Sequence, residues 1–190
     1  MENERLDRQL SFILELDKMK EILRQTYLCD ASRRENDAEH SWHLAVMTAV
    51  LSEYANTPID VGHTMMMVLL HDVIEIDAGD TYAYDPAGNL TKRDREVKAA
   101  DRIYRLLPGD QAAFFRSLWD EFEAGTTAEA KFANAMDKIQ PILLNAASGG
   151  LAWKEHGIRK EQVTDRNVHT HEGSEVLWQK TLEIISRYFD

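Results

Sequence analysis

The chain has 190 residues, a length that fits one domain with a full hydrophobic core. Its formal net charge of -11, from 22 basic and 33 acidic residues, disfavours polymeric nucleic acid and anionic membranes as partners. The first residues lack the basic flank and apolar run of a signal peptide, and no stretch is long enough to span a bilayer. The single cysteine, Cys29, excludes an internal disulfide. We therefore expect a cytoplasmic protein whose partners are small molecules.

The first part of the chain has the apolar spacing of helices and no pattern typical of a strand. One helix is predicted over residues 6–27, where leucine, isoleucine and methionine recur on one face. A polar break follows over residues 32–37. Asn36 or Asp37 is expected to cap a second helix, which runs to about Asn56.

A third helix, predicted to end at Gly79, carries the most informative residues of the chain. Its apolar first half predicts burial, and His71 and Asp72 then follow side by side. Burying an imidazole beside a carboxylate is costly unless each is paired or bound to a metal. Glu75 lies four residues after His71 and should share its helix face, whereas Asp72 points about 100° away. With Asp80 just beyond, the cluster is typical of a reaction site.

The rest of the chain is also predicted to be helical. Residues 81–90 form the longest irregular loop, which is either a lid over the acidic cluster or a plain connector. Four further helices are expected, namely residues 91–107, Asp110 to about Glu123, a helix opened by a Thr126–Glu129 capping box and kinked or interrupted at Pro141, and about Glu172 to Tyr188. The sequence thus predicts one all-α domain over residues 1–190, a bundle of about six to eight helices.

Three separated helices offer side chains that bind metals: His40, the pair His71 and Asp72, and Asp137. Each of these alone has an ordinary structural explanation. Their order, His…His-Asp…Asp with every member on a helix, resembles that of the HD-domain metal-dependent phosphohydrolase superfamily.

The resemblance is closest to the 5'-deoxynucleotidase branch of that superfamily, the HD domain-containing 2-like proteins. Its motifs lie in a core at about residues 5–145, before a C-terminal helical extension at 150–190. They are Glu39-His40-Ser41, His71-Asp72-Val73-Ile74-Glu75 with Gly79-Asp80, and Glu129-Ala130-Lys131-Phe132 leading to Asp137. The resemblance implies that His40, His71, Asp72 and Asp137 are metal ligands and that Glu75 and Asp80 are catalytic carboxylates. It also implies a homodimer.

The residue types fit that chemistry. Two imidazoles and two carboxylates suit one divalent ion that keeps positions for water and a phosphate oxygen. The ion is left open among cobalt, manganese, zinc, nickel, iron and magnesium. No histidine lies between His71 and Asp137, so the bridging ligands of a second metal are not expected. Glu75 could exchange a proton with the water or the leaving oxygen, and Asp80 could hold the water or a sugar hydroxyl.

Positive charge for a phosphate is nearest in sequence at Arg33 and Arg34, although a surface role is an equal interpretation for either one. Members of the branch that select 2'-deoxy sugars carry an Arg-Trp pair before the first metal histidine. Here Arg24 is followed by Gln25, so Arg24 is a third phosphate candidate and the basis for excluding a 2'-hydroxyl is missing.

The main interpretation is a phosphomonoester hydrolase acting on the 5'-phosphate of nucleoside monophosphates, most of all deoxynucleotides. One alternative is an HD hydrolase of another small phosphoester, such as a nucleoside triphosphate or an alarmone. Another is a catalytically silent module that binds a metal or a nucleotide. The presence of both Glu75 and Asp80 disfavours the silent module, because simple binding has no need of them.

Overall fold

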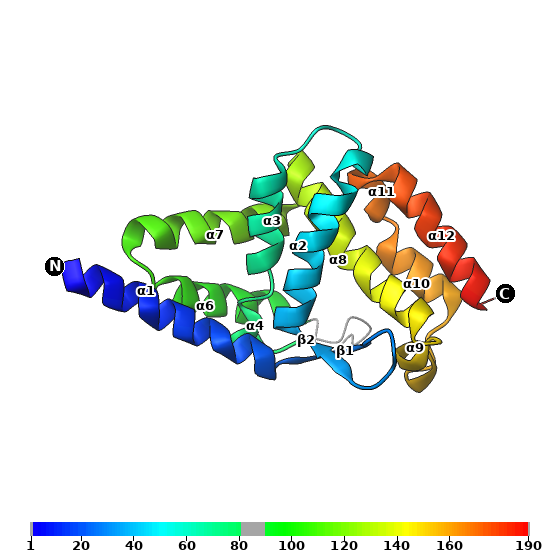
Figure 1. The fold of residues 1–190 in the computed structure, drawn as a ribbon, viewed down its shortest axis with the longest axis horizontal. Helices are drawn as coiled ribbons and strands as arrows, with labels where there is room; N and C mark the ends of the chain where they lie inside the picture. Colours follow the sequence, from blue (N-terminus) through cyan, green and yellow to red (C-terminus); the bar gives the residue numbers. More distant parts are fainter. Residues whose placement is uncertain (1, 81–89, 190) are drawn as a thin grey trace.

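The computed structural model describes residues 2–80 and 90–189, which form a bundle of helices with one small sheet (Figure 1). The long helices are α1 (Glu2–Leu16), α2 (Asp37–Leu51), α3 (Val61–Leu70), α6 (Lys92–Tyr104), α7 (Gly109–Ala124), α8 (Ala128–Ala147) and α12 (Glu175–Phe189). The shorter elements are the 3₁₀ helices η1 (Asp17–Glu21) and η2 (Ser52–Tyr54), the strands β1 (Leu23–Tyr27) and β2 (Arg34–Asn36), and the helices α4 (Glu75–Ala78), α9 (Leu151–Glu155), α10 (Lys160–Asn167) and α11 (Thr170–Gly173). The prediction of a mostly helical fold is confirmed.

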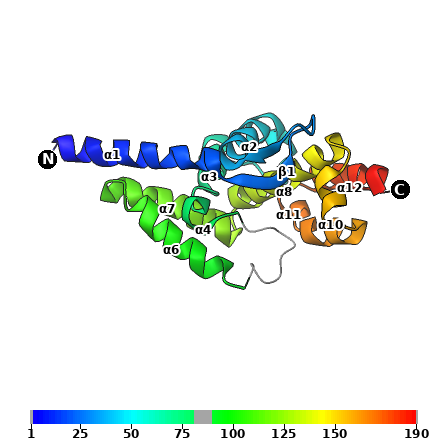
Figure 2. The ribbon, with the colours of Figure 1, turned by 90° about the horizontal axis from the view of Figure 1, so that it is seen from below.

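Helix α3 lies at the centre of the bundle, packed against α2, α7 and α8. Its side chains Met67 and Val68 are fully buried in an apolar cluster shared with α2 and α8. Leu70, at the end of α3, belongs to a second cluster with α1, α6 and α7. Figure 2 shows α1, α6 and α7 at one end of the molecule and α10 and α12 at the other. His71 and Asp72, which follow α3, therefore lie where the two apolar clusters meet.

The helix predicted over residues 6–27 is wrong in its second half. Helix α1 ends at Leu16, and after η1 the chain becomes strand β1, which pairs antiparallel with β2. In this register Leu23 faces Asn36 and Tyr27 faces Arg34. The strands lie in the segments expected to be helix and polar break. Their hydrogen bonds come from tertiary pairing, which overrides the local apolar spacing.

The central helix also differs from its prediction, because it breaks at the His-Asp pair. α3 ends at Leu70 and α4 starts only at Glu75. The ring Nδ1 of His71 donates to the carbonyl of Val68 at 2.7 Å, and the Glu75 amide donates to the Asp72 carbonyl three residues back at 2.9 Å. Such bonds tighten the chain into a turn. His71 and Glu75 therefore do not share one helix face.

Helix boundaries elsewhere test the predicted caps. Asn36 caps α2 as expected, since its side chain accepts from the Glu39 amide at 2.9 Å while the Glu39 carboxylate accepts from the Asn36 amide at 3.2 Å. Gly79 ends α4 with a φ of 72°, the backbone region that glycine enters without strain.

Two predicted caps are wrong, and one of the two outcomes expected at Pro141, an interruption, does not occur. Helix α7 starts at Gly109 rather than being capped by Asp110, whose carboxylate instead pairs with Arg5 at 2.8 Å. Thr127, not Thr126, caps α8, and Glu129 accepts from the Asp60 amide at 3.0 Å. Pro141 does not interrupt α8, which is continuous from 128 to 147. At the start of α8 the Thr127 hydroxyl accepts from the Ala130 amide at 3.1 Å, whereas the start of α7 at Pro108 has no side-chain cap.

The proposed lid, residues 81–90, falls almost wholly at residues 81–89, which lie outside the described part of the chain. Within the described residues, no helix combines the length and the apolar character needed to cross a membrane.

Candidate metal centre

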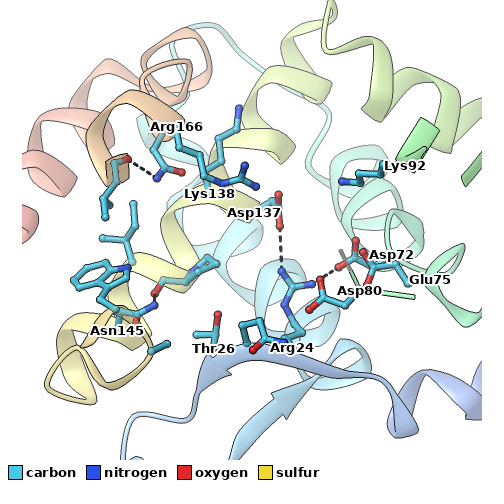
Figure 3. Close-up of a pocket in the computed structure, with 17 residues that line it drawn as sticks. Arg24, Thr26, Asp72, Glu75, Asp80, Lys92, Asp137, Lys138, Asn145 and Arg166 are labelled. Atoms are coloured by element: carbon cyan, nitrogen blue, oxygen red, sulfur yellow. Dashed lines mark hydrogen bonds and ion pairs between the residues drawn. The ribbon is translucent and has the colours of Figure 1, made fainter. Parts of the chain in front are cut away.

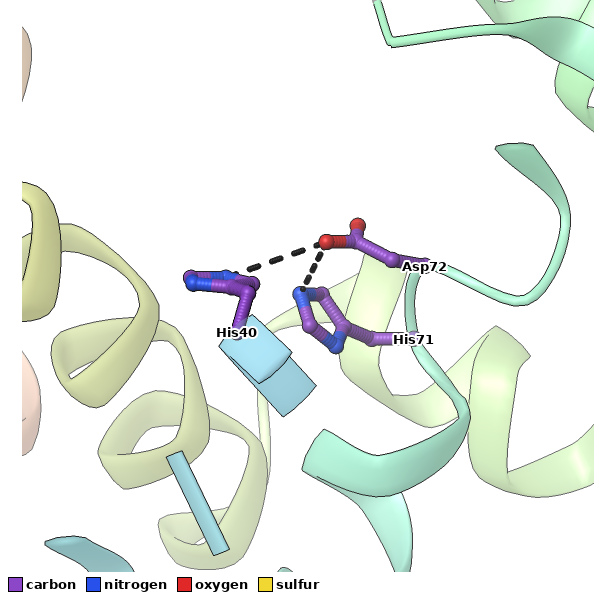
Figure 4. A group of neighbouring side chains, drawn as sticks. All are labelled: His40, His71 and Asp72. Carbon is purple, nitrogen blue, oxygen red and sulfur yellow. Dashed lines mark ion pairs between the residues drawn. The ribbon is translucent and has the colours of Figure 1, made fainter. Parts of the chain in front are cut away.

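The four predicted metal ligands converge at the middle of the bundle. His40 comes from α2, His71 and Asp72 from the turn after α3, and Asp137 from α8. The Asp72 Oδ2 atom lies 3.0 Å from His71 Nε2 and 3.8 Å from His40 Nε2. Figure 4 marks both pairs with dashed lines. Asp137 Oδ1 lies 3.1 Å from His40 Nε2 and 3.6 Å from His71 Nε2. The ligand atoms of His40, His71 and Asp72 all lie within 4.8 Å of one another, close enough to hold a metal ion.

Both imidazoles are oriented so that Nε2 faces the cluster. His40 Nδ1 lies 3.1 Å from the side-chain oxygen of Gln140, whose amide nitrogen donates to Glu35 at 2.8 Å. That oxygen accepts, so Nδ1 carries the hydrogen. His71 Nδ1 must likewise donate to the Val68 carbonyl. Each Nε2 is then free to present a lone pair, the form in which histidine binds metals.

The hydrogen bonding and charge of the cluster also favour a bound cation. His71 Nε2 is buried and has no hydrogen-bond partner among the described residues. Burial, helped by the charge of Arg24, lowers the pKa of His40 to about 4, so its ring is neutral at neutral pH. Burial opposes a charge on His71 too, yet the Asp72 and Asp137 carboxylates raise its pKa well above the usual value. An environment that favours a proton there also favours a metal cation.

Arg24 lies within this cluster rather than at its edge. Strand β1 carries it there, and its Nη1 atom is 2.6 Å from Asp72 Oδ2 and 3.5 Å from Asp37 Oδ1. Its Nη2 atom is 4.0 Å from Asp137 Oδ1, and its Nε atom is 3.7 Å from Glu35 Oε1. Although burial opposes its charge, the carboxylates of Asp72, Asp137, Glu75 and Asp37 raise the pKa of Arg24 above its ordinary value, so it stays a cation. One guanidinium thus lies within 4.0 Å of four carboxylates, of which those of Glu35, Asp37 and Asp72 are buried.

A second group of carboxylates lies beside the first. Oxygens of Asp37, Asp72 and Glu75 all lie within 4.8 Å of one another. Burial raises the pKa of Asp37 to about 7 and that of Glu75 well above its usual value, and Asp72 adds to both shifts. Asp80 has its pKa raised by burial as well. From the sequence, Asp37 was expected only as a possible helix cap. Its position three residues before His40 is the sequence feature that could have suggested a place near the ligand cluster.

These groups open into a cavity of about 170 Å³ (Figure 3). Its charged side is lined by Arg24, Asp72, Glu75, Asp80, Lys92 and Lys138. Lys92 contacts Glu96 at 3.3 Å, and this acid raises the lysine pKa although burial lowers it. Burial lowers the pKa of Lys138. The cavity therefore places cations and buried acids around one space, the combination that a phosphate ester and its hydrolysis require.

The two other arginines predicted for phosphate binding are not brought to this cavity. Arg33 forms an exposed pair with Glu39 at 2.6 Å. Arg34 lies 3.5 Å from Glu155, and its guanidinium stands 5.6 Å from the ring centre of Tyr27. Lys92 and Lys138 line the cavity instead, and nothing in the local sequence distinguishes them from surface lysines.

Comparisons with known proteins agree with the predicted family. The HD domain model matches residues 16–178. The human and bovine proteins named 5'-deoxynucleotidase HDDC2 are 29% and 27% identical over 135 residues, which is 70% of this chain. The chain spans only 65% and 64% of the length of these two relatives.

Solved structures extend the match to nearly the whole chain. A Magnetospirillum magnetotacticum MS-1 protein, described as a "Predicted metal-dependent phosphohydrolase", is 47% identical with a TM-score of 0.93, covering 97% of this chain and 93% of that one. An HD-domain phosphohydrolase from Listeria innocua shares the fold alone, with 15% identity and a TM-score of 0.60 over 94% of this chain and 84% of that one. A family model that covers most of the residues, with the ordered histidines and aspartates gathered in one cluster, shows that this chain belongs to the HD domain family.

Proposed function

We propose that the protein is a metal-dependent phosphohydrolase that removes the 5'-phosphate from nucleoside monophosphates, above all deoxynucleotides. The observation that carries this proposal is the convergence of His40, His71, Asp72 and Asp137 in one cluster, from which Asp72 and Asp137 line a cavity together with other acids and cations. The names of the HDDC2 relatives support a nucleotide as the substrate.

The roles of the residues follow from their positions. The two histidines and two aspartates would hold a divalent ion, which when bound lowers the pKa of water and polarises a phosphoryl group. Glu75 lines the cavity and is placed to exchange a proton with the attacking water or the leaving 5'-oxygen. Asp80, on the same wall, orients the water or a sugar hydroxyl. Arg24, Lys92 and Lys138 offset the charge of the phosphate.

A phosphate-release screen tests this function. The purified chain is loaded with manganese, cobalt, magnesium, nickel, zinc or iron and offered deoxy- and ribonucleoside monophosphates, nucleoside triphosphates and an alarmone. With at least one of these metals, we expect the monophosphates to be converted to equal amounts of nucleoside and inorganic phosphate. Hydrolysis confined to triphosphates or to the alarmone would replace the proposed substrate class.

We expect one metal ion per chain. Asp72 is shared between the histidine cluster and the carboxylate group formed with Asp37 and Glu75, and the Arg24 cation already lies within 3.5 Å of two of those three carboxylates. A cation so close opposes a second divalent ion by charge repulsion. Elemental analysis of dialysed protein should give a ratio near one. Two tightly bound ions per chain, or two adjacent peaks of anomalous scattering, would contradict this expectation.

Arg24→Ala is expected to raise KM for the phosphate ester about 10- to 100-fold, because the cavity loses its most buried cation. Metal content should persist, since the four ligands remain. Arg33→Ala is the matched control, as Arg33 pairs with Glu39 outside the cavity and its loss should leave KM within about twofold. Equal kinetics for wild type and Arg24→Ala would move phosphate binding to Lys92 or Lys138.

A homodimer and a cytoplasmic location belong to the same proposal. Helix α1 supports the dimer, because it exposes a row of apolar side chains at 47–74% of their full area, namely Leu6, Leu10, Ile13 and Leu14. The free, exposed Cys29 suits a reducing compartment. Light scattering on the eluting protein would measure the oligomeric state.

A further inference from the structure

The charged cluster lines only one side of the cavity. The opposite side, which we call the far wall, consists of Ile142, Asn145, Trp153, Val163 and Asn167. These residues come from the C-terminal half of α8 and from α9 and α10. In Figure 3, Asn145 lies across the cavity from Asp72, Glu75 and Lys92. The five residues of the far wall are apolar or carry amides, and Arg166, also on α10, lines the cavity beside them. The far wall itself offers no acid or base for hydrolysis and suits an uncharged ring.

The apolar part of the far wall is fixed in place by the last helix. Trp153 is only 5% exposed, and its ring centre lies 4.9 Å from that of Tyr188 and 5.2 Å from that of Phe189 on α12. Ile142 and Val163 belong to the same apolar cluster. A surface held by such packing is formed before any ligand arrives, as binding sites for small molecules usually are.

Asn145 supplies the specific polar group of this wall. It is 5% exposed, and its Nδ2 donates to the Pro141 carbonyl at 2.9 Å. That bond fixes the orientation of the amide, because only the nitrogen can donate. Its Oδ1 is buried and has no hydrogen-bond partner among the residues that the structure describes. Buried acceptors are rarely left without a donor in proteins, so this oxygen points to a donor on a ligand.

Helix α8 gives the distance that such a ligand must span. Asp137, Pro141 and Asn145 follow at intervals of four residues, and all three line the cavity. Eight residues of α-helix extend about 12 Å from the metal ligand to the amide. Inorganic phosphate is much shorter than this, whereas a nucleotide places a sugar between its phosphate and its base.

We propose that the far wall is the binding site for the nucleobase, with Asn145 Oδ1 accepting a hydrogen bond from an N–H group on the edge of the base. Trp153, Ile142 and Val163 provide the apolar surface against the ring. The inference rests on the proposed function, since it takes the phosphate to lie on the charged side of the cavity.

Binding of a free nucleoside tests the base site without requiring that the protein hydrolyse a phosphate ester. The metal-loaded full chain is titrated calorimetrically with 2'-deoxyadenosine, which has a base but no phosphate. Wild type should bind it, and Asn145→Leu should weaken binding about 5- to 10-fold, the loss expected for one hydrogen bond. Asn145→Ser should weaken it similarly while retaining a hydroxyl that can donate to the Pro141 carbonyl, which protects the helix.

The matched control is Asn134→Leu on the same helix. Asn134 also donates through Nδ2 to the carbonyl four residues earlier, at 3.0 Å, but it does not line the cavity. This variant should bind the nucleoside as wild type does. Circular dichroism checks that all three variants are folded.

Kinetics with a substrate that lacks the base complete the test. Asn145→Leu and Asn145→Ser should lower kcat/KM for deoxyadenosine monophosphate about 5- to 10-fold and leave that for 2-deoxyribose 5-phosphate within twofold. Nucleoside binding without any phosphate release would overturn the proposed function and support the base site. Phosphate release with no measurable nucleoside binding, or with equal losses on both substrates, would overturn the base site alone.

Discussion

Asp72→Ala is expected to abolish metal binding and activity together, with turnover reduced by at least about three orders of magnitude, as when one member of a catalytic unit is removed. Asp72 Oδ2 is the atom that His71 Nε2 approaches at 3.0 Å and His40 Nε2 at 3.8 Å. Without it, the two rings and Asp137 present only three ligands, and the buried Arg24 loses its nearest carboxylate, at 2.6 Å. The remaining positive charge repels a divalent ion.

Elemental analysis and phosphate release on the same preparation would measure both losses. Asp77→Ala is a suitable control, because Asp77 lies in the adjacent short helix and pairs with Arg102 at 2.8 Å, away from the cavity lining. It should keep its metal and most of its activity. Full metal content in a folded Asp72→Ala protein would remove Asp72 from the ligand set.

Glu75→Gln is expected to behave differently, keeping the metal while turnover falls by about two to four orders of magnitude, as for loss of a general acid–base group. The substitution conserves volume and changes only the ability to carry a proton. Glu75 is 6% exposed, lines the cavity, and has an Oε2 atom without a hydrogen-bond partner in the described chain. Burial, with the Asp72 and Asp37 carboxylates, raises its pKa well above the usual value.

Turnover at saturating substrate, with metal content measured in parallel, checks this result. Glu123→Gln provides the control, since Glu123 pairs with Arg93 at 2.8 Å and does not line the cavity. If Glu75→Gln matched wild type at saturation, Glu75 would have a structural role and another group would carry the proton.

Much of this protein was determined by local sequence alone. The apolar spacing predicted most helices, Asn36 predicted the start of α2, and Gly79 predicted the end of α4. Such features depend on contacts within one or two turns, so a short window of sequence contains their causes. The order of His40, the His71-Asp72 pair and Asp137 likewise predicted the family.

Only the tertiary structure decided which other residues meet these ligands. Arg24 reaches the cluster because residues 23–27 form a strand with 34–36, a pairing that overrode a helical pattern. His40 is oriented by Gln140, one hundred residues away, and the far wall is assembled by α12 packing on Trp153. Long-range hydrogen bonds and packing depend on the whole chain being folded, because the partners are neighbours only in space. For that reason the candidate ligands, Arg24 and Glu75 could be named from the sequence, whereas the contact of Arg24 with the ligand cluster and the place of Asp37 beside Asp72 and Glu75 could not.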